Sequence, residues 1–202
     1  PTRRSSDLGQ WERVDRLVLD NGFLRDFLWI GPFPNKEEAG YDEVFAPELE
    51  FNASAEYEGQ LRSVRWQRLH PAPRWGYVNF QALVEPVENS AVYALTFVYS
   101  NQIRPVAVDL GHAGAAKVWI AGHWVVGNDS YHEATPFQVH APAELQAGWN
   151  PILVKLCSKE PREFGFYLRL TTPEGRPLVA DKTPPERLRF WASSDEIPEA
   201  TG

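Results

Sequence analysis

The 202-residue sequence has little cysteine and no long apolar run. Cys157 is its one cysteine, which excludes a disulfide within the chain, and the apolar residues around it (ILVKLC) indicate a buried, unreactive thiol. No stretch approaches the length of a membrane-spanning helix, so we expect no membrane span. A chain of this size buries roughly 70% of its unfolded surface when it folds. The sequence therefore predicts a domain that needs neither a disulfide nor a metal for its stability.

Positive charge is also scarce. Twenty Lys and Arg residues stand against 27 Asp and Glu residues, which gives a formal net charge of −7. Nucleic-acid-binding surfaces depend on clustered Lys and Arg side chains that contact phosphates, so we expect no nucleic-acid partner. The acidic residues are scattered along the chain, and we interpret them as a solubilising surface.

The common catalytic signatures are missing as well. The sequence contains no Gly-x-Ser-x-Gly elbow, no glycine-rich phosphate loop and no His-Glu-x-x-His helix. A glycoside hydrolase needs two opposed carboxylates, and four acidic residues of expected loops are candidates that the sequence does not place together: Glu48, Glu50, Asp109 and Glu133. We therefore expect no catalytic residues and no enzymatic activity.

A metal site has equally little support. Three histidines (His112, His123 and His132) are close in the sequence, but their spacing matches no known ligand set, so we expect no metal ligands and no cofactor. A structural Ca²⁺ ion is the alternative that stays open, because the loops at residues 128–130 (NDS) and 42–43 (DE) carry suitable oxygen ligands.

What the sequence does contain is a series of about ten short strand-like segments. Residues 164–170 (FGFYLRL) alternate apolar and other residues most clearly, and residues 91–99 (AVYALTFVY) are apolar on both faces, which is typical of a central strand. Residues 116–126 (AKVWIAGHWVV) predict a tight hairpin that turns at Ala121-Gly122, with Trp119 and Trp124 facing the core. The fold class is therefore predicted to be all-β, an antiparallel β-sandwich of the jelly-roll kind.

The ends of the chain differ from this central part. Residues 11–20 (WERVDRLVLD) fit a short helix or an extended lead-in, and residues 36–57 predict a long acidic loop that is either functional or packed over the sheet. Residues 181–202 are rich in Pro and Glu, and Phe190-Trp191 either dock this tail on the domain or begin a following one. We expect a lead-in at 1–20, the sandwich at 21–180 and a linker or tail at 181–202.

Three stretches together resemble a known family. Residues 21–35 (NGFLRDFLWIGPFPN), 117–125 (KVWIAGHWV) and 143–156 (AELQAGWNPILVKL) are similar to the galactose-binding-domain-like jelly rolls attached to bacterial secreted hydrolases. The resemblance implies an accessory module of a larger bacterial protein that is secreted or held in the cell envelope. The chain departs from the family pattern at Gly111-His112-Ala113-Gly114, where relatives often carry an acidic turn, and at Ala121, where they carry Asn.

The first eight residues have a different resemblance. PTRRSSDL looks like the translation of a common short-read sequencing adapter, which would make the chain a fragment from the edge of a metagenomic contig. No signal peptide is visible in this fragment, so localisation is inferred from the kind of domain alone.

Carbohydrate binding requires an exposed aromatic ring flanked by polar groups, because a sugar has an apolar face ringed by hydroxyls. Two clusters have that composition: Trp75 and Tyr77 in RWGY, and Asn128, Tyr131, His132 and Glu133 in NDSYHE. We predict that these residues bind a glycan. In the alternative, Trp75 caps the core, the second cluster is a solvated loop, and the domain packs against a neighbouring catalytic or repeat domain through an apolar patch near its termini.

Overall fold

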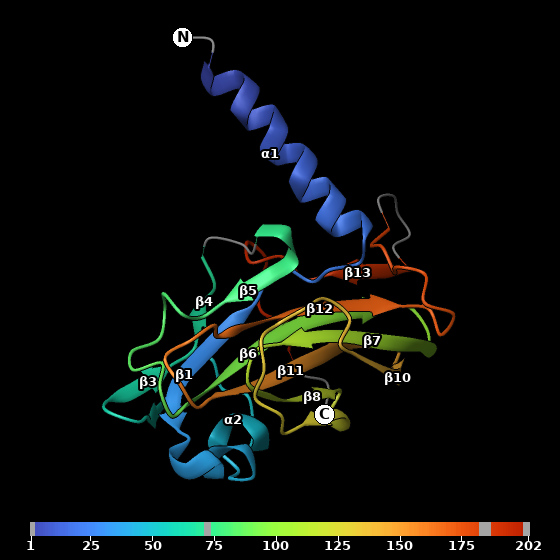
Figure 1. The fold of residues 1–202 in the computed structure, drawn as a ribbon. Coiled ribbons are helices and arrows are strands. Elements are labelled where there is room, and N and C mark those ends of the chain that lie inside the picture. The colour runs from blue at the N-terminus through green and yellow to red at the C-terminus, as the bar shows by residue number, and fades with distance from the viewer. Residues whose placement is uncertain (1–2, 71–73, 182–186, 200–202) are drawn as a thin grey trace.

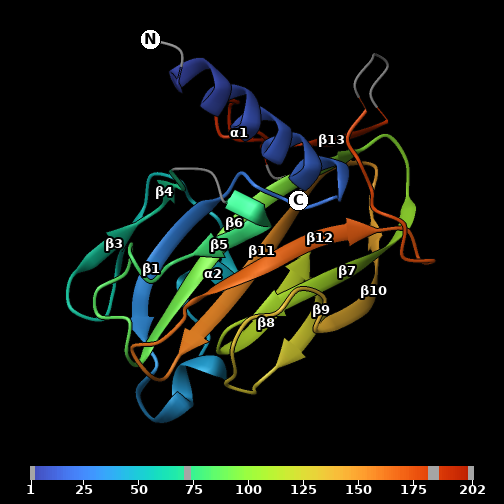
Figure 2. The ribbon, with the colours of Figure 1, turned by 45° about the horizontal axis from the view of Figure 1, so that its top comes forward.

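The fold is an antiparallel β-sandwich, as the computed structural model shows for residues 3–70, 74–181 and 187–199. The larger sheet has the order β4-β1-β6-β11-β8-β9, with β13 also paired to β6, and the smaller has the order β10-β7-β12-β5. Figures 1 and 2 show the sheets as two layers. The all-β class and the antiparallel sandwich that the sequence predicts are confirmed.

The strands of the larger sheet are β1 (Leu28–Pro34), β4 (Gln67–Arg68), β6 (Ser90–Ser100), β8 (Ala115–Ile120), β9 (His123–Asn128), β11 (Gly148–Ser158) and β13 (Leu188–Phe190). Those of the smaller sheet are β5 (Tyr77–Asn79), β7 (Arg104–His112), β10 (Val139–Leu145) and β12 (Gly165–Thr171). A separate ribbon joins β2 (Glu56–Glu58) to β3 (Ser63–Arg65). The helices are α1 (Arg3–Asp20), η1 (Lys36–Tyr41), α2 (Ala46–Leu49) and η2 (Arg74–Gly76).

The main core lies between the two sheets and follows the predicted alternation. On β12, Phe166, Leu168 and Leu170 are buried in this core, whereas Tyr167 and Arg169 point to the outer face. β6 is buried along almost its whole length because a second core lies on its other side, which explains a strand that is apolar on both faces. Cys157 belongs to this second core, so its predicted burial is confirmed, and burial raises the pKa of its thiol to about 12.

The second core lies under a layer of irregular chain on the outer face of the larger sheet. The predicted acidic loop forms this layer as η1, α2 and the segment before β3, so it is packed over the sheet. Trp191 is also buried there, with its ring centroid 5.9 Å from that of Phe97, directly after β13 pairs with β6. Of the two alternatives for Phe190-Trp191, the structure therefore shows docking on the sandwich. The role of residues 181–202 as a linker in a longer protein stays a prediction.

Two lysines hold the irregular layer on the sheet. Lys155 of β11 is completely buried, and its Nζ donates to the carbonyls of Tyr41 and Glu43 and to Glu48 Oε1. Lys117 of β8, its register partner, lies 4.1 Å from the ring centroid of Tyr41. These lysines belong to two of the stretches that resemble the jelly-roll family, and their contacts give them a structural role.

The hairpin of β8 and β9 turns at Ala121-Gly122, as predicted, and both residues have positive φ, at 48° and 77°. The expectation that both tryptophans face the core is wrong: Trp124 is 67% exposed, and Trp119 is half-buried outside the core. Val118, Ile120 and Val126 take the core-facing positions of the hairpin. Trp119 and Trp124 are paired across the strands and therefore share the opposite face.

We expect that replacing Ala121 with asparagine raises the free energy of unfolding by about 0.5–1 kcal/mol, because asparagine tolerates the left-handed backbone that this turn requires. Urea unfolding of the two proteins measures the difference. Ala82→Asn is the matched control, at an exposed turn position whose φ is not positive. An equal change in the free energy of unfolding for Ala121→Asn and Ala82→Asn would contradict this explanation of the turn.

α1 is helical, which resolves the choice left open for residues 11–20. It ends where Gly22 adopts a φ of 78° and donates its N–H to the carbonyl of Leu19. The helix projects away from the sandwich and meets it near its C-terminal end, where Val18 is buried (Figure 1). Among the described residues, no helix combines the length and the apolarity that a membrane crossing requires.

Candidate functional site

The outer face of the smaller sheet carries a group of aromatic side chains. Tyr77 on the edge strand β5 is in register with Tyr167 on β12, and their ring centroids lie 4.8 Å apart. Both rings are half-buried. They face outward because their strand neighbours Val78, Phe166 and Leu168 fill the core.

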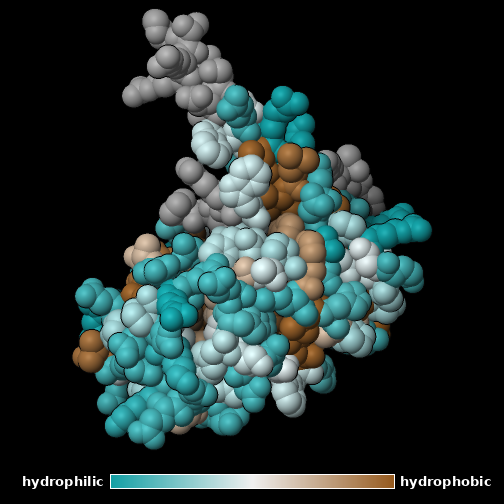
Figure 3. Space-filling model, viewed as in Figure 1, coloured by the Kyte–Doolittle hydropathy of each residue, from teal (hydrophilic) through white to brown (hydrophobic). Residues whose placement is uncertain are grey.

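Two more aromatic residues extend this group and are well exposed. Phe137 is 48% exposed, and its ring stacks on Phe23 at 5.9 Å, while Phe23 lies 6.2 Å from Tyr167. Trp75 is 63% exposed and precedes Gly76, where a Cβ would lie only 2.7 Å from the ring of Phe23. We call these five residues the aromatic strip: Phe23, Trp75, Tyr77, Phe137 and Tyr167. Figure 3 shows pale and brown side chains in a band on this face, among hydrophilic ones.

The backbone at the two exposed rings is unfavourable. Trp75 has a φ of 57° and Phe137 a φ of 64°, in the left-handed region that bulky residues rarely adopt. Each such residue costs roughly 1–2 kcal/mol, so the surrounding structure must hold it in place. Strain of this kind gathers at binding sites, and here it presents two large rings to solvent.

Polar groups adjoin the strip. Asp109 of β7 is buried, and it accepts hydrogen bonds from Arg169 Nε at 2.7 Å and from His140 Nδ1 at 2.5 Å. The Arg169 guanidinium lies 3.8 Å from the ring centroid of Phe137, a cation–π contact. The Arg169–Asp109–His140 cluster therefore supplies fixed donors and acceptors beside an exposed aromatic face.

The loop between β9 and β10 (residues 129–138) carries Phe137 and forms a small pocket at its other end. Tyr131, His132 and Glu133 line this pocket together with Glu163 and residues 158–160. Its volume is about 140 Å³, whereas ligand pockets usually reach roughly 300 Å³ or more. The pocket residue Glu163 lies close to Tyr77 of the aromatic strip: burial raises the pKa of the Tyr77 hydroxyl, and the Glu163 carboxylate raises it further. The pocket and the aromatic strip are therefore neighbours.

The loop is fixed to β7 by polar contacts of Gln138. His112 donates its backbone N–H to Gln138 Oε1 at 2.6 Å, and Gln138 Nε2 donates to the carbonyl of Glu133 at 2.8 Å. The His112 ring is fully buried, its Nδ1 donates to the carbonyl of Gly114, and its centroid lies 4.5 Å from that of His132. Burial lowers the pKa of His112 to about 4, so the ring is neutral at pH 7.

The six residues predicted to bind a glycan are thus divided. Trp75 and Tyr77 lie in the aromatic strip, and Trp75 does not cap the core. Tyr131, His132 and Glu133 line the neighbouring pocket, where the Tyr131 hydroxyl accepts from Asn35 Nδ2 and burial raises its pKa to about 12. Asn128 lies at the end of β9 in the other sheet, where its Oδ1 accepts from the Ser130 N–H.

The strip also contains residues that the sequence analysis missed. Tyr167 and Arg169 occupy the outward positions of the most clearly alternating strand, so the alternation itself could have identified them. Phe23 and Phe137 give no local signal, because their contact joins two distant parts of the chain.

The described residues offer few groups that are placed to bind a metal ion or to act as a general acid and base. Nowhere in residues 3–70, 74–181 and 187–199 do three or more His, Cys, Asp or Glu residues gather in a way that could hold a metal ion. Calcium at the loops 42–43 or 128–130 stays a prediction. Two of the four candidate carboxylates, Glu48 and Asp109, are held in ion pairs with residues of different sheets, Lys155 of β11 and Arg169 of β12.

No protein-family model matches the chain, and no curated protein matches it either. Solved structures are similar only at the level of the fold. The PA14 domain of the MpAFP antifreeze protein is 15% identical over 43% of this chain and 45% of its own, with a TM-score of 0.37. A β-glucosidase from Kluyveromyces marxianus in complex with glucose is 11% identical over 77% of this chain and 18% of its own, with a TM-score of 0.46. A GH31 α-xylosidase from Xanthomonas citri is 12% identical over 85% of this chain and 15% of its own, with a TM-score of 0.34.

This chain covers less than half of each of those three solved chains. Identities and TM-scores this low do not assign a function, and the resemblance to galactose-binding-domain-like modules stays a prediction at the level of the family.

Proposed function

We propose that the chain is a non-catalytic β-sandwich module that binds carbohydrate on the aromatic strip, as part of a larger secreted or envelope bacterial protein. The observation that carries this proposal is the exposed ring of Phe137, held at positive φ beside the Arg169–Asp109–His140 cluster, with Trp75 as a second exposed ring at positive φ.

The chemistry of the strip suits a sugar. A pyranose ring has apolar C–H faces that pack on aromatic rings, and hydroxyls at its edge that need hydrogen-bond partners. Trp75 and Phe137 offer the rings, and the Arg169 guanidinium and the His140 imidazole offer polar groups beside Phe137. His132 and Glu133, which line the adjoining pocket, extend the polar groups beyond Tyr77.

We expect that replacing Trp75 or Phe137 with alanine weakens oligosaccharide binding about fivefold to tenfold, because each change removes one stacking ring. Titration with xylo-, cello- and galacto-oligosaccharides, followed by tryptophan fluorescence and calorimetry, measures the affinity. Trp124→Ala is the matched control, since Trp124 is equally exposed but belongs to the other sheet. The proposal fails if the native chain binds none of these glycans, or if all three variants lose affinity equally.

A second function, a module that packs against a neighbouring domain, is favoured by one observation. α1 projects from the sandwich (Figure 1), and its side chains Leu17 and Leu19 are 58% and 40% exposed. Exposed apolar side chains on a projecting helix are available for contact with a neighbouring domain. This function predicts no saturable response in the glycan titrations described above.

A further inference from the structure

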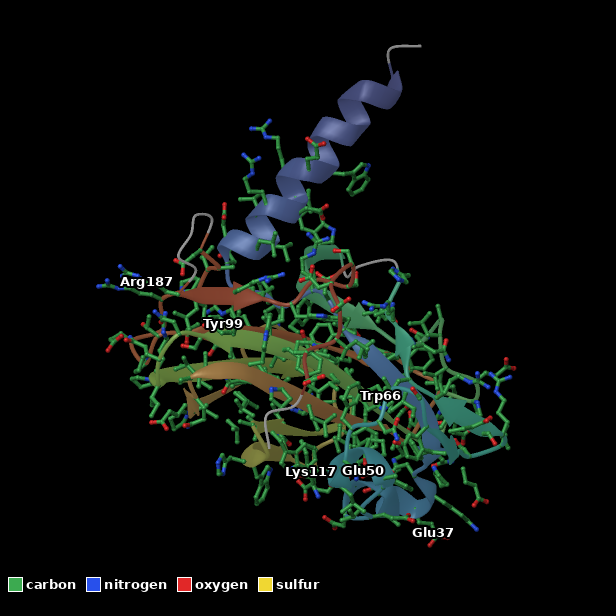
Figure 4. All side chains as sticks on the ribbon, turned by 180° about the vertical axis from the view of Figure 1, so that it is seen from behind. Glu37, Glu50, Trp66, Tyr99, Lys117 and Arg187 are labelled. Atoms are coloured by element: carbon green, nitrogen blue, oxygen red, sulfur yellow. The ribbon has the colours of Figure 1, made fainter. Side chains whose placement is uncertain are left out.

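A largely apolar cavity lies on the side of the molecule opposite the aromatic strip. It has a volume of about 350 Å³, within the range of small-molecule sites, and lies between the outer face of the larger sheet and α2. Trp66 and Phe97 lie in the second core beneath it, and Leu49, Phe51 and Trp119 line it as well. We call this cavity the outer groove, and Figure 4 shows Trp66 and Glu50 on this side.

Among the described residues, the charged side chains that line the outer groove are two carboxylates, Glu48 and Glu50. Glu48 is neutralised from below, since its Oε1 lies 2.7 Å from the buried Lys155 Nζ. Glu50 is exposed and forms no ion pair among the described residues, and its charge contributes, after burial, to the raised pKa of Tyr57. Asp42, in the turn that leads into α2, is paired with Lys117 at 3.4 Å, so the uncompensated charge at the groove is the carboxylate of Glu50. The electrostatic potential at the groove therefore favours a cation and opposes an anion.

We propose that the outer groove binds a small amphipathic cation, an ammonium group on a short apolar body. Leu49, Phe51 and Trp119 provide apolar surface for the body. An ammonium group gains both from the Glu50 carboxylate and from the faces of aromatic rings, which attract cations. A sugar suits this groove less well than the aromatic strip, because most of its lining offers no hydrogen-bond partner for hydroxyls.

The test compares three probes of equal chain length: hexyltrimethylammonium, hexanol and hexanoate. Calorimetry and tryptophan fluorescence on the full chain are expected to show saturable binding of the ammonium probe and at least tenfold weaker binding of hexanoate. Glu50→Gln is expected to weaken the ammonium probe about fivefold, since it removes the charge and keeps the shape. Trp119→Ala is expected to weaken both the ammonium probe and hexanol.

Trp75→Ala separates this site from the proposed glycan site, because it is expected to leave binding of the ammonium probe unchanged. Glycan binding is in turn expected to be unchanged in Glu50→Gln. The proposal is overturned if hexanoate or hexanol binds as well as the ammonium probe, if Glu50→Gln has no effect, or if no probe binds.

Discussion

Replacing Lys155 with alanine is expected to lower the free energy of unfolding by about 3–5 kcal/mol. The native ammonium is fully buried and donates to Glu48 Oε1 at 2.7 Å and to the carbonyls of Glu43 and Tyr41 at 2.6 and 3.2 Å. Without it, the Glu48 carboxylate keeps the Tyr93 hydroxyl as its one side-chain donor among the described residues and becomes a nearly buried, uncompensated charge. Urea unfolding measures the loss.

Lys117→Ala is the matched control for this prediction. Lys117 is the register partner of Lys155, but its salt bridge at 3.4 Å is with Asp42, whose side chain is 88% exposed. An exposed pair of this kind contributes about 1 kcal/mol or less. If Lys155→Ala is no more destabilising than Lys117→Ala, then Lys155 does not anchor the irregular layer. The double variant Lys155→Ala with Glu48→Gln is expected to recover part of the loss, because it removes the orphaned charge.

The sequence could predict what depends on local periodicity. The alternation at residues 164–170 identified β12 and its core side chains, and Ala121-Gly122 identified the hairpin turn. The alternation of apolar and polar residues does not indicate which outer face of the sandwich other segments of the chain cover. Trp124 was therefore expected in the core, although it lies on the outer face of an edge strand. The burial of Lys155 was equally hidden, because its partners come from η1, the turn after it and α2.

In the candidate site, too, the sequence predicted the residues that form a local pattern and missed those that come together from distant segments. Trp75 and Tyr77 were found because an aromatic pair beside turn residues is a local pattern. The strip is completed by Phe23 and Phe137, which meet only when the lead-in to β1 and the loop before β10 fold onto the same sheet. Asn128 was grouped with Tyr131 because they are close in sequence, but the hairpin end separates it from the pocket.

Acidification is expected to destabilise the fold, and first the loop of residues 129–138, through His112. Burial lowers the pKa of His112 to about 4 in the folded protein, whereas an unfolded histidine has a pKa of about 6.5. The unfolded chain therefore binds this proton at a higher pH than the folded chain. The contribution of the neutral His112 ring to the free energy of unfolding is therefore fully present above about pH 6.5. It is lost as the pH falls toward 4, by roughly 3 kcal/mol in total.

The loop is the part of the molecule most exposed to this change. The His112 ring touches the ring of His132 within it, and Gln138, beside Phe137, accepts from the His112 backbone. We therefore expect hydrogen exchange of residues 129–138 to accelerate below pH 6 before global unfolding, and oligosaccharide affinity to fall with it if Phe137 stacks on the sugar.

His112→Asn isolates the contribution of the imidazole, because other groups also titrate between pH 4 and 6.5. Asparagine keeps a short side chain with a donor amide that can reach the Gly114 carbonyl, but it does not titrate. The variant is expected to be less stable at pH 7 and to show a shallower dependence of unfolding free energy on pH in this window. His123→Asn, at an exposed site in β9, is expected to leave the slope unchanged. Equal slopes in the native chain and His112→Asn would show that a different group causes the acid sensitivity, because only a buried neutral imidazole predicts a loss confined to this window.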